Sequence, residues 1–169
     1  GAIDAFESSD FDLYLVGNKK EIVEVLQSNG KTFDENFIVN TEDNIAMSES
    51  PTTAIKKKRD SSIVVGCGML KAGKADAFCS AGNTGAMSVG SIFEIGRIKG
   101  VSRPALTAPL PNQNEGFTFL TDVGAFVDSK PKHLLDYAKL SSVFVEEIYG
   151  IKNPKVGVLN VGEEEAKGY

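Results

Sequence analysis

The stretch ADAFC, residues 75–79, runs directly into SAGNTGA, residues 80–86, and this junction decides the expected fold. The apolar first part predicts a short buried strand, and a helical pattern that begins at Asn83 continues to Arg97. A strand that passes through a short loop into a helix is the repeating unit of α/β proteins. The junction therefore favours parallel strands covered by helices.

Comparable patterns extend from this junction in both directions. Asn18 and Glu21 have the spacing of a capping box, and Asn29-Gly30 ends the helix that they begin. A polar, glycine-containing connection at residues 112–116 predicts a hairpin. The expected strands are residues 11–16, 37–39, 75–79, 105–110, 117–121 and 155–160, and the expected helices are residues 18–29, 51–70, 83–97 and 129–150. Together they predict a mostly parallel sheet with helices on both faces.

Composition narrows the class of protein. The 169 residues have a formal charge of −5 and are 41% hydrophobic and 24% charged, which is typical of one globular domain. The acidic balance argues against general nucleic-acid binding. Cys67 and Cys79 are too few for a disulfide scaffold and lack metal-ligand spacing, so a reducing cytoplasm is expected. The sequence shows no targeting segment, and polar residues and glycines interrupt its longest uncharged run, residues 77–93.

Three small polar loops follow expected strands, at the end of the sheet where α/β proteins bind ligands. The first is residues 80–85. Its glycines let backbone N–H groups approach a ligand, Asn83 and Thr84 add side-chain donors, and the next helix begins there. These are the ingredients of a phosphate site, although the loop matches neither the P-loop nor GxGxxG. The structural alternative is a glycine-rich turn capped by Asn83.

The second and third loops carry charged side chains. The second loop begins at Asp122 and ends at Asp128, and these carboxylates could bind a metal or orient a hydroxyl. The alternative is a turn in which Asp128 caps the next helix. The third loop, residues 162–168, combines three glutamates with Lys167. A lysine there can stabilise a developing oxyanion, whereas the alternative is a solvated surface run.

His133, the only histidine, narrows the possible mechanisms. One histidine excludes a histidine-rich metal site, and no GxSxG sequence provides a serine nucleophile for a catalytic triad. We expect His133 to be a helix-surface residue. A mechanism in which a bound anion such as phosphate attacks the substrate is therefore favoured over one with a protein nucleophile.

A run of cations, Lys56, Lys57, Lys58 and Arg59, covers every face of one helical turn, so part of it must face solvent. It could steer an acidic partner or a phosphorylated ligand to the protein by long-range attraction. The alternative is an ordinary solvated helix face.

Five ordered blocks resemble the bacterial phosphate acyltransferases of phospholipid synthesis, the PlsX family, over nearly the whole chain. The blocks are SPTTAIKKKRDSS (50–62), SAGNTGA (80–86), RPAL (103–106), DVGAFVD with KPKHLL (122–135) and VGVLNVGEEEAKG (156–168). The family's fold is similar to the three-layer isopropylmalate dehydrogenase architecture and to phosphotransacetylase.

The resemblance implies an acyltransferase that moves a fatty acyl group from acyl carrier protein to inorganic phosphate, giving acyl phosphate. It implies a cytoplasmic homodimer with peripheral membrane contact, and it suggests neither a cofactor nor a metal. Lys167 matches the lysine of the family's closing loop and is the candidate catalytic residue, and Lys56–Arg59 is the candidate docking run for the acidic carrier protein. The candidate phosphate- or substrate-binding residues are Ser80, Gly82, Asn83, Thr84, Gly85, Asp122, Gly124, Asp128, Asn160, Gly162 and Glu163.

The chain departs from the family pattern in several places. Phe126 and Tyr169 each stand where asparagine is usual. The family's opening Asp-Ala-Met-Gly-Gly-Asp motif and everything after the closing loop, including the dimerisation and membrane-contacting helices, are absent. We therefore expect residues 1–169 to form one α/β domain that is part of a longer chain. The alternatives are a phosphotransacetylase-like exchange with another thioester, a nucleotide-linked dehydrogenase, whose dinucleotide fingerprint is missing, and a non-catalytic module that binds acyl carrier protein or lipid.

Overall fold

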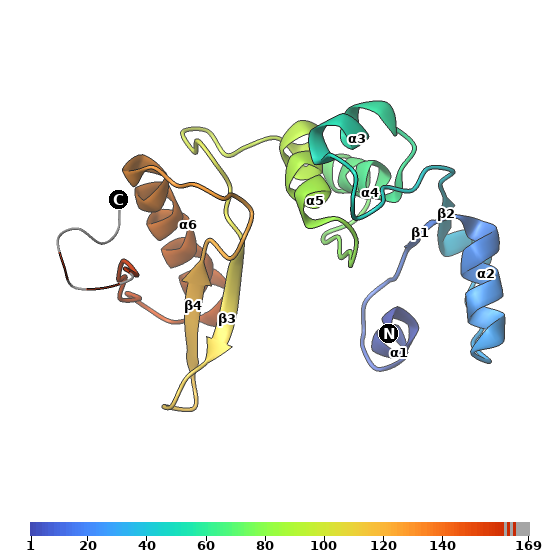
Figure 1. Ribbon diagram of the computed structural model, residues 1–169. Coiled ribbons are helices and arrows are strands. Elements are labelled where there is room, and N and C mark those ends of the chain that lie inside the picture. Colours follow the sequence, from blue (N-terminus) through green and yellow to red (C-terminus); the bar gives the residue numbers. More distant parts are fainter. Residues whose placement is uncertain (161, 163, 165–169) are drawn as a thin grey trace. The chain divides into compact units, whose positions relative to one another are not determined.

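The computed structural model describes residues 1–160 together with Gly162 and Glu164. The chain divides into two compact units, Gly1–Gly96 and Arg97–Tyr169 (Figure 1). In unit 1 the elements are α1 (Ala2–Glu7), β1 (Leu15–Gly17), α2 (Lys19–Ser28), η1 (Glu35–Phe37), β2 (Ile38–Asn40), α3 (Pro51–Lys57), α4 (Ser62–Lys71), α5 (Thr84–Gly90) and the π-helix η2 (Ser91–Ile95). In unit 2 they are β3 (Thr107–Pro111), β4 (Phe117–Thr121) and α6 (Pro131–Tyr149).

A short parallel ladder forms the first part of unit 1. β1 pairs with β2 from Leu15 opposite Ile38 to Gly17 opposite Asn40, so the first predicted strand is confirmed only at its end. Asn18 caps α2 as the sequence predicts, with its Oδ1 accepting a hydrogen bond from the Glu21 N–H at 3.2 Å. These contacts join strand and helix in the expected order.

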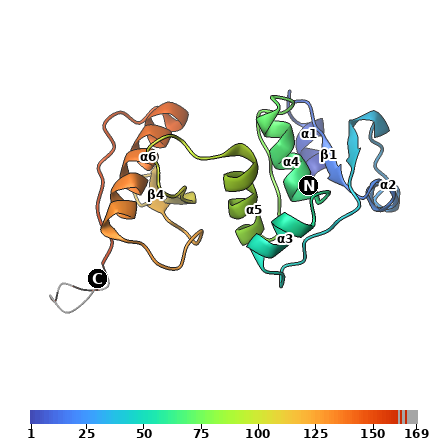
Figure 2. The same cartoon turned by 90° about the horizontal axis from the view of Figure 1, so that it is seen from above.

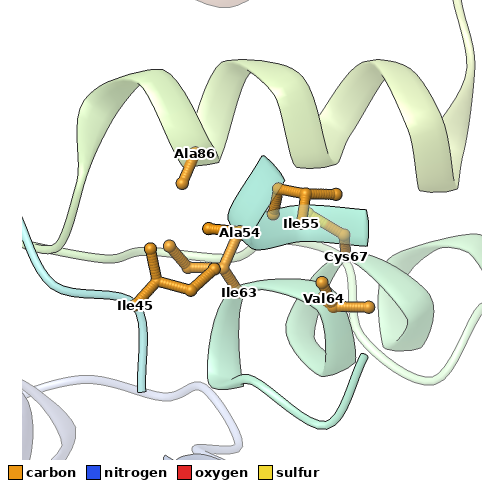
Figure 3. Packing of buried hydrophobic residues seen from close by; sticks show 7 residues of the cluster. All are labelled: Ile45, Ala54, Ile55, Ile63, Val64, Cys67 and Ala86. Atoms are coloured by element: carbon orange, nitrogen blue, oxygen red, sulfur yellow. The ribbon is translucent and has the colours of Figure 1, made fainter. Parts of the chain in front are cut away.

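The hydrophobic core of unit 1 lies among three helices. Side chains from α3, α4 and α5 converge there with Ile45 from the preceding loop, and Ala86 of α5 faces the other two helices (Figure 3). The cluster consists of Ile45, Ala54, Ile55, Ile63, Val64, Cys67 and Ala86. It fixes the first residues of α5, and therefore the end of the glycine-rich loop, against α3 and α4.

The helix expected over residues 51–70 is two helices, which corrects the prediction. α3 ends at Lys57, and the chain between α3 and α4 contacts the segment after β2 instead of continuing the helix. The Asp60 carboxylate accepts a hydrogen bond from the Glu42 N–H at 2.7 Å, and Asp43 and Ser61 form an isolated parallel bridge. A long-range backbone contact therefore replaces the helical hydrogen bonds at this point.

Residues 75–79 form no strand, contrary to the prediction from ADAFC. Most of the segment is exposed, and among the described residues β1 and β2 pair with each other and not with it. Its one strong contact is Phe78, whose ring covers Gly66 so closely that a Cβ on Gly66 would lie 2.6 Å from the ring. An apolar run without a neighbouring strand keeps no ladder, because strand hydrogen bonds come from a partner.

Unit 2 is a hairpin packed on a helix. β3 and β4 pair antiparallel, with Thr107 opposite Thr121 (Figure 1). α6 contacts β4 and lies beside it when the molecule is seen from above (Figure 2). The hydroxyl of Thr121 lies 2.8 Å from that of Thr107 and 2.9 Å from that of Ser141, which links both strands to α6. Gly150 ends α6 with a φ of 67°, so the predicted hairpin and helix are both confirmed.

The prediction of a last strand over residues 155–160 is wrong, as is that over residues 75–79, because neither segment forms a strand. Its residues are exposed and have no ladder. The described residues therefore contain one parallel pair and one antiparallel pair, and the expected single, mostly parallel sheet is not observed. The broad class, mixed α/β, is confirmed. No helix among the described residues has both the length and the apolar character needed to cross a bilayer.

Candidate functional site

The first candidate loop, residues 80–85, leads into α5 through a side-chain cap. Asn83 is 6% exposed, and its Oδ1 accepts a hydrogen bond from the Ala86 N–H at 2.9 Å. Its amide Nδ2 lies within 3.1–3.2 Å of the carbonyl oxygens of Ala46, Met47 and Glu49. The capping alternative is therefore observed, and the Asn83 side chain is engaged within the protein.

The other polar groups of this loop differ in how far they are available to a ligand. Ser80 closes a tight turn by accepting a hydrogen bond from the Gly82 N–H at 3.1 Å, and Thr84 is exposed. The N–H groups of Thr84 and Gly85 belong to the first helical turn, where no intrahelical acceptor exists. An anion here would meet main-chain donors and the Thr84 hydroxyl.

Gly85 has a packing role that the sequence did not reveal. A Cβ at this position would lie 2.5 Å from Cγ of Pro51, the first residue of α3. The starts of α3 and α5 therefore touch at Gly85. The absence of a side chain there serves helix packing as well as any approach of a ligand.

Asp122 of the second loop is a loop-closing acceptor. Its Oδ1 accepts hydrogen bonds from the N–H groups of Leu106 at 3.0 Å and Ala125 at 3.1 Å, and its Oδ2 accepts one from Phe126 at 3.0 Å. These bonds fix the residues after β4 against the residues before β3. Asp122 thus shapes the loop that contains Gly124.

Asp128 does not cap the next helix, which corrects the structural alternative for this loop. The N-cap of α6 is Lys130, and Asp128 is exposed. Its carbonyl oxygen accepts a hydrogen bond from Arg103 at 3.1 Å, and the Arg103 guanidinium lies 4.8 Å from the centre of the Phe126 ring. Phe126, which stands where the family usually has asparagine, therefore stacks against Arg103 of the RPAL block.

His133 is buried, whereas a helix-surface position was expected. Its Nδ1 accepts a hydrogen bond from the Lys130 N–H at 3.1 Å, and its ring lies 6.4 Å from that of Tyr137. Burial, followed by the nearby charges of Arg103 and Lys130, lowers the pKa of His133. The histidine completes the start of α6 in place of a conventional capping residue.

The third loop is described only in part. The Asn160 side chain donates a hydrogen bond to the Gly162 carbonyl at 2.8 Å. Glu163 and the candidate catalytic Lys167 lie outside the described residues. Their assignments stay predictions.

The cation run divides into different environments. Lys58 donates to Glu49 at 2.7 Å, Arg59 forms an ion pair with Glu94, and Lys56 lies 5.7 Å from the centre of the Phe93 ring. Lys57 is exposed. Lys58 and Arg59 therefore take part in internal contacts, while Lys56 and Lys57 present positive charge at the surface.

Sequence reasoning missed Glu49 and Arg103 as parts of these loops. Glu49 precedes the quoted motif by one residue, and Arg103 was noted only within RPAL. Arg103 contacts Asp128, 25 residues further along the chain, and Glu49 contacts Lys58 on the other side of α3, so neither pair has a motif spacing that would predict it. Among the described residues, His, Cys, Asp and Glu form no group of three that could hold a metal ion, and Cys67 and Cys79 are free thiols.

The loops and their order along the chain belong to a known family. The sequence model of the fatty acid synthesis protein family matches residues 1–169, and the chain therefore belongs to this family. It is 44% identical over 170 residues to a phosphate acyltransferase of Clostridioides difficile, an alignment that covers 99% of this chain and 49% of that protein. It is 46% identical over 168 residues to one of Desulfitobacterium hafniense, covering 99% and 50%.

A relative of Halalkalibacterium halodurans with the same name is 44% identical over 167 residues, covering 99% of this chain and 48% of that protein. The chain thus spans about half the length of the curated relatives that it matches. The resemblance drawn from the five sequence blocks is confirmed.

Proposed function

We propose that this chain is part of an acyltransferase that moves a fatty acyl group from acyl carrier protein to inorganic phosphate, giving acyl phosphate for phospholipid synthesis. The observation that carries the proposal is the 44–46% identity to proteins named phosphate acyltransferase over 99% of the chain. The first loop supports it, because the N–H groups of Thr84 and Gly85 have no intrahelical acceptor and Thr84, with its hydroxyl, is exposed.

In the proposed reaction a phosphate oxygen attacks the carbonyl carbon of the thioester. A carbon–oxygen bond forms, the tetrahedral intermediate collapses, and the carbon–sulfur bond breaks. The leaving thiolate takes up the proton that phosphate releases, so no oxidant or reductant is needed. The first loop would hold the phosphate, and Lys167 would offset charge on the intermediate.

The proposal extends to partners and place of action. The acidic carrier protein would be attracted to the exposed Lys56 and Lys57. A cytoplasmic homodimer that contacts the membrane peripherally is proposed for the whole protein, on the strength of the family resemblance.

The test uses the full-length protein with acyl-carrier-protein thioester and varied inorganic phosphate. We expect loss of thioester and formation of acyl phosphate to depend on phosphate, and Lys167→Ala to lower kcat by roughly 100- to 1,000-fold. Lys152→Ala, at an exposed lysine outside residues 155–160, is the matched control and should retain the wild-type rate. Circular dichroism checks that both variants fold.

Three outcomes would contradict the proposal. Thioester loss that does not depend on phosphate excludes the transferase, and carrier-protein binding without turnover favours the non-catalytic module. Turnover with coenzyme A thioesters but not with carrier-protein thioesters favours the phosphotransacetylase-like alternative. A wild-type rate in Lys167→Ala would leave the transferase in place and assign the catalytic role elsewhere.

A further inference from the structure

The loop of residues 44–49 is held at both ends by its own Glu49 and by Lys58, the residue that follows α3. Glu49 closes the loop on itself, because its Oε1 accepts a hydrogen bond from the Ala46 N–H at 2.7 Å. Lys58 reaches both ends, with its Nζ 2.5 Å from the Asn44 carbonyl oxygen and 2.7 Å from Glu49 Oε1. One carboxylate and one ammonium therefore fasten the whole 44–49 loop.

The same loop contacts the start of α5 through Asn83. The Asn83 amide lies within hydrogen-bond distance of the carbonyl oxygens of Ala46, Met47 and Glu49, while its Oδ1 caps the Ala86 N–H. Any shift of the 44–49 loop would move these carbonyls away from Asn83. The position of the cap, and of residues 80–85 before it, thus depends on the loop.

The ion pair between Lys58 and Glu49 is sheltered compared with the other charges of the cation run. The two side chains are 31% and 32% exposed, whereas Arg59 is 58% exposed. The hydrogen bond from Lys58, with that from the Ala46 N–H, lowers the pKa of Glu49 and so favours its carboxylate form. Its geometry joins α3 to the 44–49 loop, and Asn83 continues the connection to α5.

We infer that Lys58 and Glu49 are positioning residues for the phosphate loop, residues 80–85, and that Lys58 is not a docking residue for the carrier protein. The inference rests on the proposed function, because the ligand of that loop is phosphate there. Neither residue needs to touch substrate. They act by holding the 44–49 loop, which holds Asn83 and the first turn of α5.

The first measurement separates phosphate use from donor docking in the full-length enzyme. Lys58→Met keeps the length of the side chain and removes its charge, and Lys57→Met is the matched control one residue away. We expect Lys58→Met and Glu49→Gln each to raise the phosphate KM by roughly tenfold, less than the loss that a 1 Å misplacement of a reacting group causes. The KM of Lys58→Met and of Glu49→Gln for the acyl donor should not change. Lys58→Arg, which retains the charge, should restore most of the phosphate affinity.

A double-mutant cycle tests the pair directly. Because each single change already breaks the ion pair, Lys58→Met with Glu49→Gln should raise the phosphate KM no further than either change alone. Equal rises in donor KM for Lys58→Met and Lys57→Met, with phosphate KM unchanged, would overturn the inference and return Lys58 to the docking surface. Unchanged values for both substrates would also overturn it.

Amide hydrogen exchange gives a measurement that needs no turnover. Lys58→Met should accelerate exchange at the Ala46 and Ala86 amides, and Lys57→Met should not. If the wild-type enzyme uses no phosphate, the proposed function fails, and faster exchange still shows that the ion pair positions residues 80–85. Unchanged exchange at both amides would contradict the positioning role independently of the activity.

Discussion

At the scale of single residues, substitution of Gly85 can show whether a glycine is needed there for helix packing or for ligand binding. A Cβ there would lie 2.5 Å from Cγ of Pro51, a ring atom with little freedom to move. We expect Gly85→Ala to lower the free energy of unfolding by about 1–3 kcal/mol, as overpacking commonly does. Thermal or urea unfolding of the 169-residue chain measures this change.

The control for Gly85 is a glycine whose Cβ would meet open space. Gly68 lies within α4 with no atom near its Cβ position, so Gly68→Ala should stabilise the chain by up to about 1 kcal/mol. Pro51→Ala removes the clashing atom and should recover most of the stability lost in Gly85→Ala. If stability returns but the full-length enzyme keeps a raised phosphate KM, Gly85 also serves the ligand. Additive losses would exclude the contact as the cause.

At the scale of elements, the start of α6 makes unit 2 sensitive to pH. The pKa of His133 is lowered in the folded state, chiefly by burial, with Arg103 and Lys130 adding repulsion and Asp136 opposing it. As pH falls below about 6.5, the unfolded chain binds a proton that the folded chain resists. Above that pH, His133 is neutral in both states and does not lower the free energy of unfolding. Below it, the free energy of unfolding decreases as the solution becomes more acidic.

His133→Asn tests this pH dependence, because an asparagine Oδ1 can accept the Lys130 N–H without titrating. Between pH 7.5 and 5.5 the melting temperature of the wild-type chain should fall more than that of the variant. His133 is the only histidine, so no second imidazole contributes to the difference. Parallel curves for the two proteins would show that His133 has the same pKa in the folded and unfolded states.

The elements that the sequence predicted well depend on neighbours along the chain. The Asn18 cap, the hairpin around residues 112–116 and the end of α6 at Gly150 each follow from local turn or capping chemistry. Residues 75–79 and 155–160 have strand-like composition, but a ladder needs a partner that composition does not supply. Likewise, the break between α3 and α4 depends on the contact of Asp60 with Glu42.

The candidate site follows the same division. Spacing predicted that Asn83 would begin a helix, and that is observed. Its second role, holding the carbonyls of the 44–49 loop, depends on a segment more than 30 residues away. The burial of His133 and the stacking of Arg103 on Phe126 are also products of tertiary packing. Motifs therefore indicated candidate loops, and packing determines what each described side chain in them contacts.

At the scale of the whole molecule, the question is whether residues 155–160, exposed in this chain, are also exposed in the full-length protein. Val158 and Leu159 are 76% and 83% exposed, although the segment has the apolar character of a buried strand. Replacing both with serine should change the stability of the 169-residue chain by no more than about 0.5 kcal/mol, because contacts at such exposed positions are few. Val145→Ala, at a position on α6 that is 4% exposed, should by contrast lower the free energy of unfolding of the 169-residue chain. The scale for this loss is about 1.5–3 kcal/mol, the free energy of burying a whole valine side chain.

The same double substitution in the full-length protein should be strongly destabilising, because the curated relatives are about twice as long and offer further surface to cover the segment. Chemical denaturation of both lengths, with and without the two serines, gives the comparison. A double substitution that is neutral at both lengths would mean that the segment stays at the surface in the complete enzyme. A loss confined to the full-length protein would identify residues 155–160 as core that the 169-residue chain by itself leaves exposed.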